Sequence, residues 1–84
     1  MDKEKIFGKI LQEERKAKKI SQEKLAKLTG LDRTFISLIE NGKRSPTFST
    51  ISKICLALDI LPSEVFSKYE SQDPDFSFQK GGKK

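Results

Sequence analysis

Histidine and tryptophan are both absent from this chain of 84 residues, and cysteine occurs only once, as Cys55. The lack of histidine removes the side chain that most often moves protons near neutral pH. A single cysteine excludes an internal disulfide, so the composition is most simply that of a cytoplasmic protein. No apolar run approaches the ~18 residues of a membrane span, and the opening MDKEKIFGKI lacks the hydrophobic segment of a signal peptide.

The sequence features of an enzyme are also missing. There is no glycine-rich phosphate-binding loop, and no group of side chains has the spacing of metal ligands. Cys55 falls in the apolar stripe of an expected helix, where a small core residue is more usual than a redox sensor. We therefore expect no catalytic residue, no metal or cofactor, no small-molecule ligand and no membrane partner.

Positive charge is present in excess, with 17 lysine and arginine residues against 12 aspartate and glutamate residues. Residues 70–84 contain equal numbers of each sign, so residues 1–69 carry the whole net charge of +5. A basic folded region suits a polyanionic partner, most often nucleic acid. Charge alone does not decide the matter, because many small basic proteins bind no nucleic acid.

Apolar residues recur at helical spacing in five segments, and no segment alternates as a strand does. The expected helices cover residues 3–18, 22–29, 33–41, 48–58 and 62–69. Ser21, Asp32 and Thr47 are favourable N-caps, while Gly30 and Gly42 suit helix ends. We predict an all-α fold of five short helices in which residues 1–69 form the single domain and residues 70–84 a flexible C-terminal tail.

Residues 21–41 predict a helix-turn-helix, in which two short helices meet at a tight turn and the second enters the major groove of DNA. The turn requires a small residue within the first helix and a glycine at the bend, which Ala26 and Gly30 supply. On a helical wheel at about 100° per residue, Phe35, Ile36 and Ile39 fall on the buried side of the second helix.

The opposite side of this second helix carries side chains that suit the recognition of base pairs. Arginine can donate to guanine, hydroxyl groups can donate or accept, and an apolar side chain suits the methyl group of thymine. The residues for which we predict base contacts are Arg33, Thr34, Ser37 and Leu38. Two alternatives remain open at this point: Arg33 could pair with a nearby carboxylate, and Leu38 could lie at the edge of the core.

The stretch SQEKLAKLTGLDRTFISLIENGKRSP and the closing ICLALDILPSEVF resemble the phage repressor/Cro (Xre-like) helix-turn-helix family over residues 5–69. Within it, GLDRTFIS with KICLALDI is most similar to the controller proteins of restriction–modification systems. The resemblance implies a compact five-helix, lambda-repressor-like DNA-binding domain and a small dimeric regulator of transcription, acting near its own gene. Two departures are Thr29, where an apolar residue is usual, and Phe35, where controller proteins often carry tyrosine.

The resemblance also implies roles for single residues. Gln22 matches a residue that donates to a DNA phosphate, and the residues matching the loop that grips the DNA backbone are Asn41, Lys43 and Arg44. Glu40 lies at the border of the buried face, where an unpaired carboxylate is unfavourable. The resemblance implies that Arg15 pairs with it in a structural role.

A symmetric homodimer is expected, because one recognition helix reads only a few base pairs. Two such helices about 34 Å apart would fit successive turns of a near-palindromic operator. Ile60, Leu61 and Val65, with Phe66, are more apolar residues than so small a domain can easily hide. We expect the first three at the dimer interface, with Leu61 and Val65 exposed in a monomer; alternatively, all four fill the core.

Other functions remain open at this level. The chain could be a phage immunity repressor or a general Xre-type regulator with no linked restriction system. It could also be an antitoxin-type interaction module, whose tail folds onto a partner through Phe76 and Phe78. The main expectation is double-stranded DNA as partner, bound by an autoregulatory homodimer.

Overall fold

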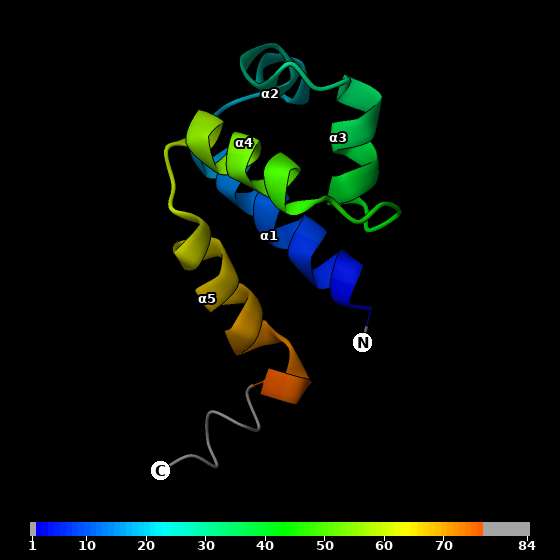
Figure 1. Cartoon of the computed structure of the whole chain (residues 1–84), viewed down its shortest axis with the longest axis vertical. Helices are drawn as coiled ribbons and strands as arrows, with labels where there is room; N and C mark the ends of the chain where they lie inside the picture. Colours follow the sequence, from blue (N-terminus) through cyan, green and yellow to red (C-terminus); the bar gives the residue numbers. More distant parts are fainter. Residues whose placement is uncertain (1, 77–84) are drawn as a thin grey trace.

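The computed structural model describes residues 2–76, which contain five α-helices, one further helical turn at residues 74–76, and no strand. The helices are α1 (Lys3–Ala17), α2 (Gln22–Thr29), α3 (Arg33–Glu40), α4 (Phe48–Leu58) and α5 (Pro62–Gln72) (Figure 1). The all-α prediction is confirmed, and α2 and α4 have the expected bounds. None of the helices within residues 2–76 combines the length and the hydropathy that a membrane span requires.

Signals that are local in the sequence set most of these bounds. The Ser21 hydroxyl accepts from the Lys24 N–H at 3.0 Å, and so satisfies a backbone donor that the first turn of α2 leaves unpaired. Gly30 ends α2 with a φ of 77°, a left-handed conformation that side chains with a Cβ rarely adopt. Gly42 has a similar φ of 73° after α3.

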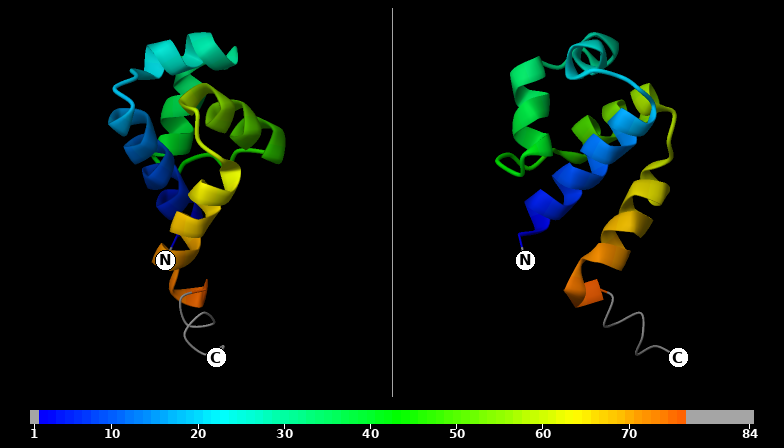
Figure 2. Two further views of the ribbon diagram at one scale, coloured as in Figure 1. Left: turned by 90° about the vertical axis from the view of Figure 1, so that its left-hand side faces the viewer. Right: turned by 180° about the vertical axis from the view of Figure 1, so that it is seen from behind.

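α1 is the central helix, and in the right-hand view of Figure 2 it lies between α3 and α5. Gly8 allows the close approach of α1 to α3, because a Cβ at this position would lie only 2.2 Å from the carbonyl oxygen of Ile39. The buried apolar residues form one cluster: Ile6, Phe7, Ile10, Leu11, Leu25, Ile36, Ile39, Ile51, Ile54, Cys55, Leu58 and Val65.

α5 is longer than expected and continues beyond Tyr69 to Gln72, so the domain boundary expected at residue 69 falls inside this helix. The chain then returns to the start of α1. Buried Asp73 accepts from Lys3 Nζ at 2.6 Å and from the Tyr69 hydroxyl. These bonds lower the pKa of Asp73 from 3.8 to about 2. The tail residues 77–84, including Phe78, lie outside the described residues.

The corner between α4 and α5 differs from its prediction in one residue. Leu61 is 62% exposed, as expected, and Ile60 is half-buried against the core. The expectation that Val65 is exposed in a monomer is wrong, because Val65 is only 1% exposed and belongs to the core. It lies one helical turn before Tyr69, on the face of α5 that packs inward. Leu56, which the sequence analysis did not single out, is 80% exposed.

Candidate DNA-binding site

The turn between α2 and α3 is closed by the side chain of Thr29, the residue that departs from the family pattern. Its hydroxyl donates to the Leu25 carbonyl at 2.8 Å and accepts from the Leu31 N–H at 3.2 Å. The hydroxyl therefore satisfies a backbone donor in the turn, which the more usual apolar residue could not do. Asp32 then caps α3 by accepting from the Thr34 N–H at 3.3 Å.

The four residues predicted to contact bases share the side of α3 that faces away from the core. Arg33 and Thr34 are exposed in its first turn, while Ser37 and Leu38 are half-buried one turn later. Asn41 caps the end of α3, and its amide donates to the Ser37 hydroxyl at 3.4 Å. The arrangement gathers one cationic donor, two hydroxyls and an apolar side chain on one face.

The loop after α3 holds its two basic residues close to that helix. Lys43 and Arg44 are exposed, and their N–H groups donate to the Leu38 carbonyl at 2.8 Å and 3.3 Å. The Arg44 guanidinium lies 5.5 Å from the ring centre of Phe35, within the range of a cation–π contact. Half-buried Phe35 thus packs at the core edge and also supports a basic side chain, a role that sequence reasoning missed.

Arg15 of α1 and Glu40 of α3 form the ion pair that the family resemblance implies. Arg15 Nε donates to Glu40 Oε2 at 2.7 Å, and Arg15 Nη2 donates to Glu40 Oε1 at 3.0 Å. The two side chains are only 8% and 2% exposed. Arg15 Nη1 also donates to the Ile20 carbonyl at 2.8 Å, so this buried guanidinium is bonded on both sides.

Gln22, at the start of α2, connects this buried pair to the surface of α3. Its Nε2 donates to Glu40 Oε1 at 2.9 Å, and its Oε1 accepts from Arg33 Nη1 at 2.9 Å. Sequence reasoning placed Gln22 at a phosphate and missed both contacts. The sequence pattern gave no signal for them: Gln22 and Arg33 are each the first residue of a helix, but they lie 11 residues apart and meet only because α2 packs on α3.

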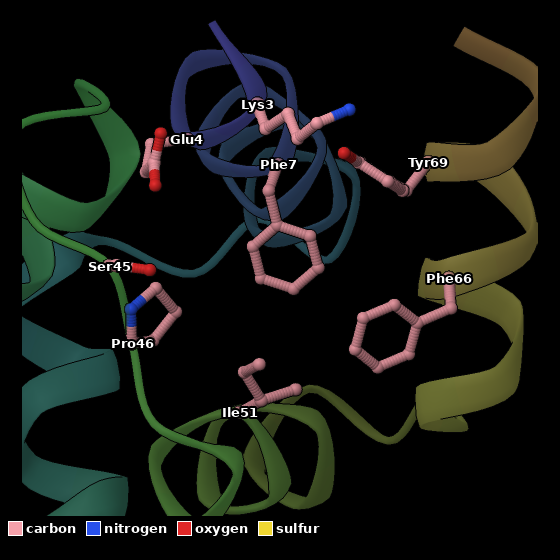
Figure 3. A pocket seen from close by; sticks show the side chains of 8 residues that line it. All are labelled: Lys3, Glu4, Phe7, Ser45, Pro46, Ile51, Phe66 and Tyr69. Atoms are coloured by element: carbon pink, nitrogen blue, oxygen red, sulfur yellow. The ribbon is translucent and has the colours of Figure 1, made fainter. Parts of the chain in front are cut away.

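An apolar pocket of about 190 Å³ lies elsewhere, between α1, α5 and the loop before α4 (Figure 3). Phe7 and Phe66 stack beside it, with ring centres 5.5 Å apart. None of its lining residues comes from α2 or α3.

Among residues 2–76, no three aspartate, glutamate or cysteine residues gather as a metal site would require. The polar side chains that converge are Gln22 at the start of α2 and Arg33 and Glu40 at the two ends of α3.

Comparison with known proteins agrees with this geometry. The helix-turn-helix family model matches residues 11–65. The chain belongs to the helix-turn-helix family. Control protein C.MunI of a Mycoplasma species is 45% identical over 67 residues, which cover 79% of this chain and 90% of that protein. The ImmF control region 10 kDa protein of Bacillus phage phi105 is 36% identical over 56 residues, which cover 67% of this chain and 62% of that protein.

A solved structure gives the same result at the level of the fold. The restriction–modification controller protein C.AhdI from Aeromonas hydrophila superposes with a TM-score of 0.73 and is 46% identical. The superposition covers 75% of this chain and 96% of C.AhdI. The resemblance to Xre-like regulators and to control proteins, noted from the sequence, is thereby confirmed.

Proposed function

We propose that this helix-turn-helix protein is a sequence-specific DNA-binding regulator of transcription that recognises its operator through α3. The observation that carries the proposal is the outward face of this helix. Arg33 and Thr34 stand exposed at its start, and a hydrogen-bonded connection to the buried ion pair holds Arg33. A helix face that contacted only solvent would gain nothing from an arginine held in place by hydrogen bonds.

The contacts divide into two kinds. Base edges in the major groove are met by Arg33, Thr34, Ser37 and Leu38, since together these offer donors, acceptors and an apolar surface. The DNA backbone is met by Gln22, Asn41, Lys43 and Arg44, which lie at the start of α2 and the end of α3. Backbone contacts fix the orientation of the protein, and base contacts supply the sequence preference.

A homodimer forms through the corner between α4 and α5. Leu56 and Leu61 are largely exposed there, with Ile60 between the two helices. Large exposed apolar side chains that cluster on one surface favour association. Two-fold symmetry then presents both copies of α3 to half-sites about 34 Å apart on a near-palindromic operator.

The regulated gene is most simply the protein's own, as part of a restriction–modification system. The support is the similarity to C.MunI and C.AhdI, at 45% and 46% identity. The similarity to the phage phi105 protein keeps a phage-type repressor as the second candidate. In both cases the protein acts by occupying DNA and carries out no reaction.

Fluorescence anisotropy with the DNA just upstream of this protein's own gene tests the proposal, with a shuffled duplex as control and two salt concentrations. We expect tight binding to the native duplex alone, and a weaker preference for that duplex in Arg33→Ala. Equal and steeply salt-dependent binding to both duplexes would contradict it, because charge alone would then be recognised.

A further inference from the structure

Four side chains form a continuous hydrogen-bonded series from the core to the recognition surface: Arg15, Glu40, Gln22 and Arg33. They come from α1, α3, α2 and α3 in that order. The buried pair at one end is held by two hydrogen bonds. The other end is exposed Arg33, and arginine is the side chain that most often makes specific contacts with bases.

The chemistry of each member fixes the direction of the series. Glu40 as a carboxylate can only accept, and Arg33 can only donate. Gln22 lies between them and satisfies both, because its amide has a donor end and an acceptor end. Lysine at this position would lack the acceptor, glutamate would lack the donor, and methionine would lack both.

We propose that Glu40 is a positioning residue for base recognition, acting through Gln22 on Arg33. The inference rests on the proposed function, in which Arg33 meets a base edge. It assigns the buried ion pair a part in sequence preference as well as in stability. Gln22 thereby gains a second task beside any phosphate contact, for which its remaining N–H is still available.

Positioning favours binding because the Arg33 side chain is already restricted in the free protein and loses less conformational entropy when it contacts a base. An exposed arginine has many rotamers, and fixing one of them against a base costs conformational entropy. The bond to Gln22 restricts the guanidinium in the free protein, while four of its five N–H donors remain for the DNA. Gln22 can impose this restriction because Glu40 is itself fixed by Arg15.

The positioning role predicts results that differ from those of a phosphate anchor. Loss of a phosphate contact weakens binding nearly equally for all sequences and lowers the salt dependence. Loss of positioning weakens the preference at one base pair, the one that Arg33 reads. Gln22→Lys separates the two, because lysine can still donate to Glu40 and adds a charge for phosphate but offers Arg33 no acceptor.

The experiment uses the full chain and a library of randomised duplexes to find the selected half-site, followed by affinities for every single base change in it. Arg33→Ala identifies the base pair that Arg33 reads. At that base pair we expect Gln22→Lys and Gln22→Met each to lose about threefold to tenfold in preference, the range for one hydrogen bond. Gln72→Met makes the same chemical change at the exposed end of α5 and should alter nothing.

Glu40→Gln tests the buried end of the series against a purely structural role. Its control is Ile54→Val, a core change in α4 that should also lower the melting temperature. Glu40→Gln should weaken the preference at the base pair of Arg33, whereas Ile54→Val should not. In the Gln22→Met background Glu40→Gln should cause no further loss, because the effect passes through Gln22.

Two results would overturn the inference while leaving the proposed function intact. One is an unchanged preference at the base pair of Arg33 in both Gln22 variants. The other is an equal loss at every position of the half-site. If the wild-type chain selects no sequence from the library, the proposed function fails and this inference fails with it.

Discussion

Two surfaces of this small domain differ in their chemistry. On the surface formed by α2 and α3, an exposed polar side chain is hydrogen-bonded to buried ones, as Arg33 is through Gln22 to Glu40. At the corner between α4 and α5, Leu56 and Leu61 project outward, 80% and 62% exposed. The first surface is built to hold donors in fixed directions, which suits base recognition. The second is an apolar surface, which suits a second copy of the chain.

The largest expected effect is a loss of stability when the buried ion pair between Arg15 and Glu40 is broken. Glu40→Ala leaves the Arg15 guanidinium buried without its carboxylate, which should cost about 3–5 kcal/mol of unfolding free energy. Urea or thermal unfolding followed by circular dichroism measures the loss. Glu70→Ala, at an exposed position of α5, is the control. A melting temperature equal to that of the wild type would show that the ion pair contributes nothing to stability.

The apolar corner is tested by Leu61→Glu, which places a charge in the proposed dimer interface. The loss expected for a central interface residue is about 2 kcal/mol of association free energy or more. Sedimentation should show monomers at concentrations where the wild type is dimeric, with an unchanged helical spectrum. Ser67→Glu, at an exposed position of α5, the helix that follows Leu61, should leave the dimer intact. Dimers that persist in Leu61→Glu would place the interface elsewhere.

A smaller and sequence-independent effect is expected in the basic loop. Lys43→Ala removes one proposed phosphate contact, so it should weaken binding to operator and shuffled DNA alike. The slope of log affinity against log salt concentration should fall by about 1. Anisotropy titrations at several salt concentrations measure this slope. A loss confined to the operator would mean that Lys43 contacts bases.

The smallest expected effect is on stability, at the contact between Lys3 at the start of α1 and Asp73 after α5, which is remote from both surfaces. Asp73 has a lowered pKa of about 2, because Lys3 and Tyr69 donate to its carboxylate. Its stabilising contribution is complete above the unfolded pKa of about 3.9 and is lost as pH falls through about 2. Asp73→Asn should therefore lower the melting temperature near neutral pH, by an amount that shrinks on acidification. Asp59→Asn, at an exposed position, should not; a difference independent of pH would contradict the assignment.

Local signals in the sequence predicted most of the fold, and distant contacts account for what they missed. The caps Ser21 and Thr47 gave the starts of α2 and α4, because each bonds a backbone group three residues away. The end of α5 was missed since it depends on Lys3 meeting Asp73, 70 residues away. Val65 was misjudged because the packing of α5 decides which of its apolar residues face inward.

The candidate site was predictable in its composition but not in its connections. The wheel of α3 placed Arg33 and Thr34 on the outward face, where the structure has them. No periodicity could show that Gln22 contacts Glu40, 18 residues away, or Arg33, 11 residues away. Such contacts arise only when α1, α2 and α3 pack together.

The central claim is that α3 reads bases, and the most direct test compares wild type with Arg33→Ala on operator duplexes carrying each single base change. The account predicts that wild type discriminates at one base pair where Arg33→Ala does not, a difference of about 1–3 kcal/mol. The preferences at all other positions should be retained. A uniform weakening across all duplexes, with every preference kept, would contradict it and reduce Arg33 to a backbone contact.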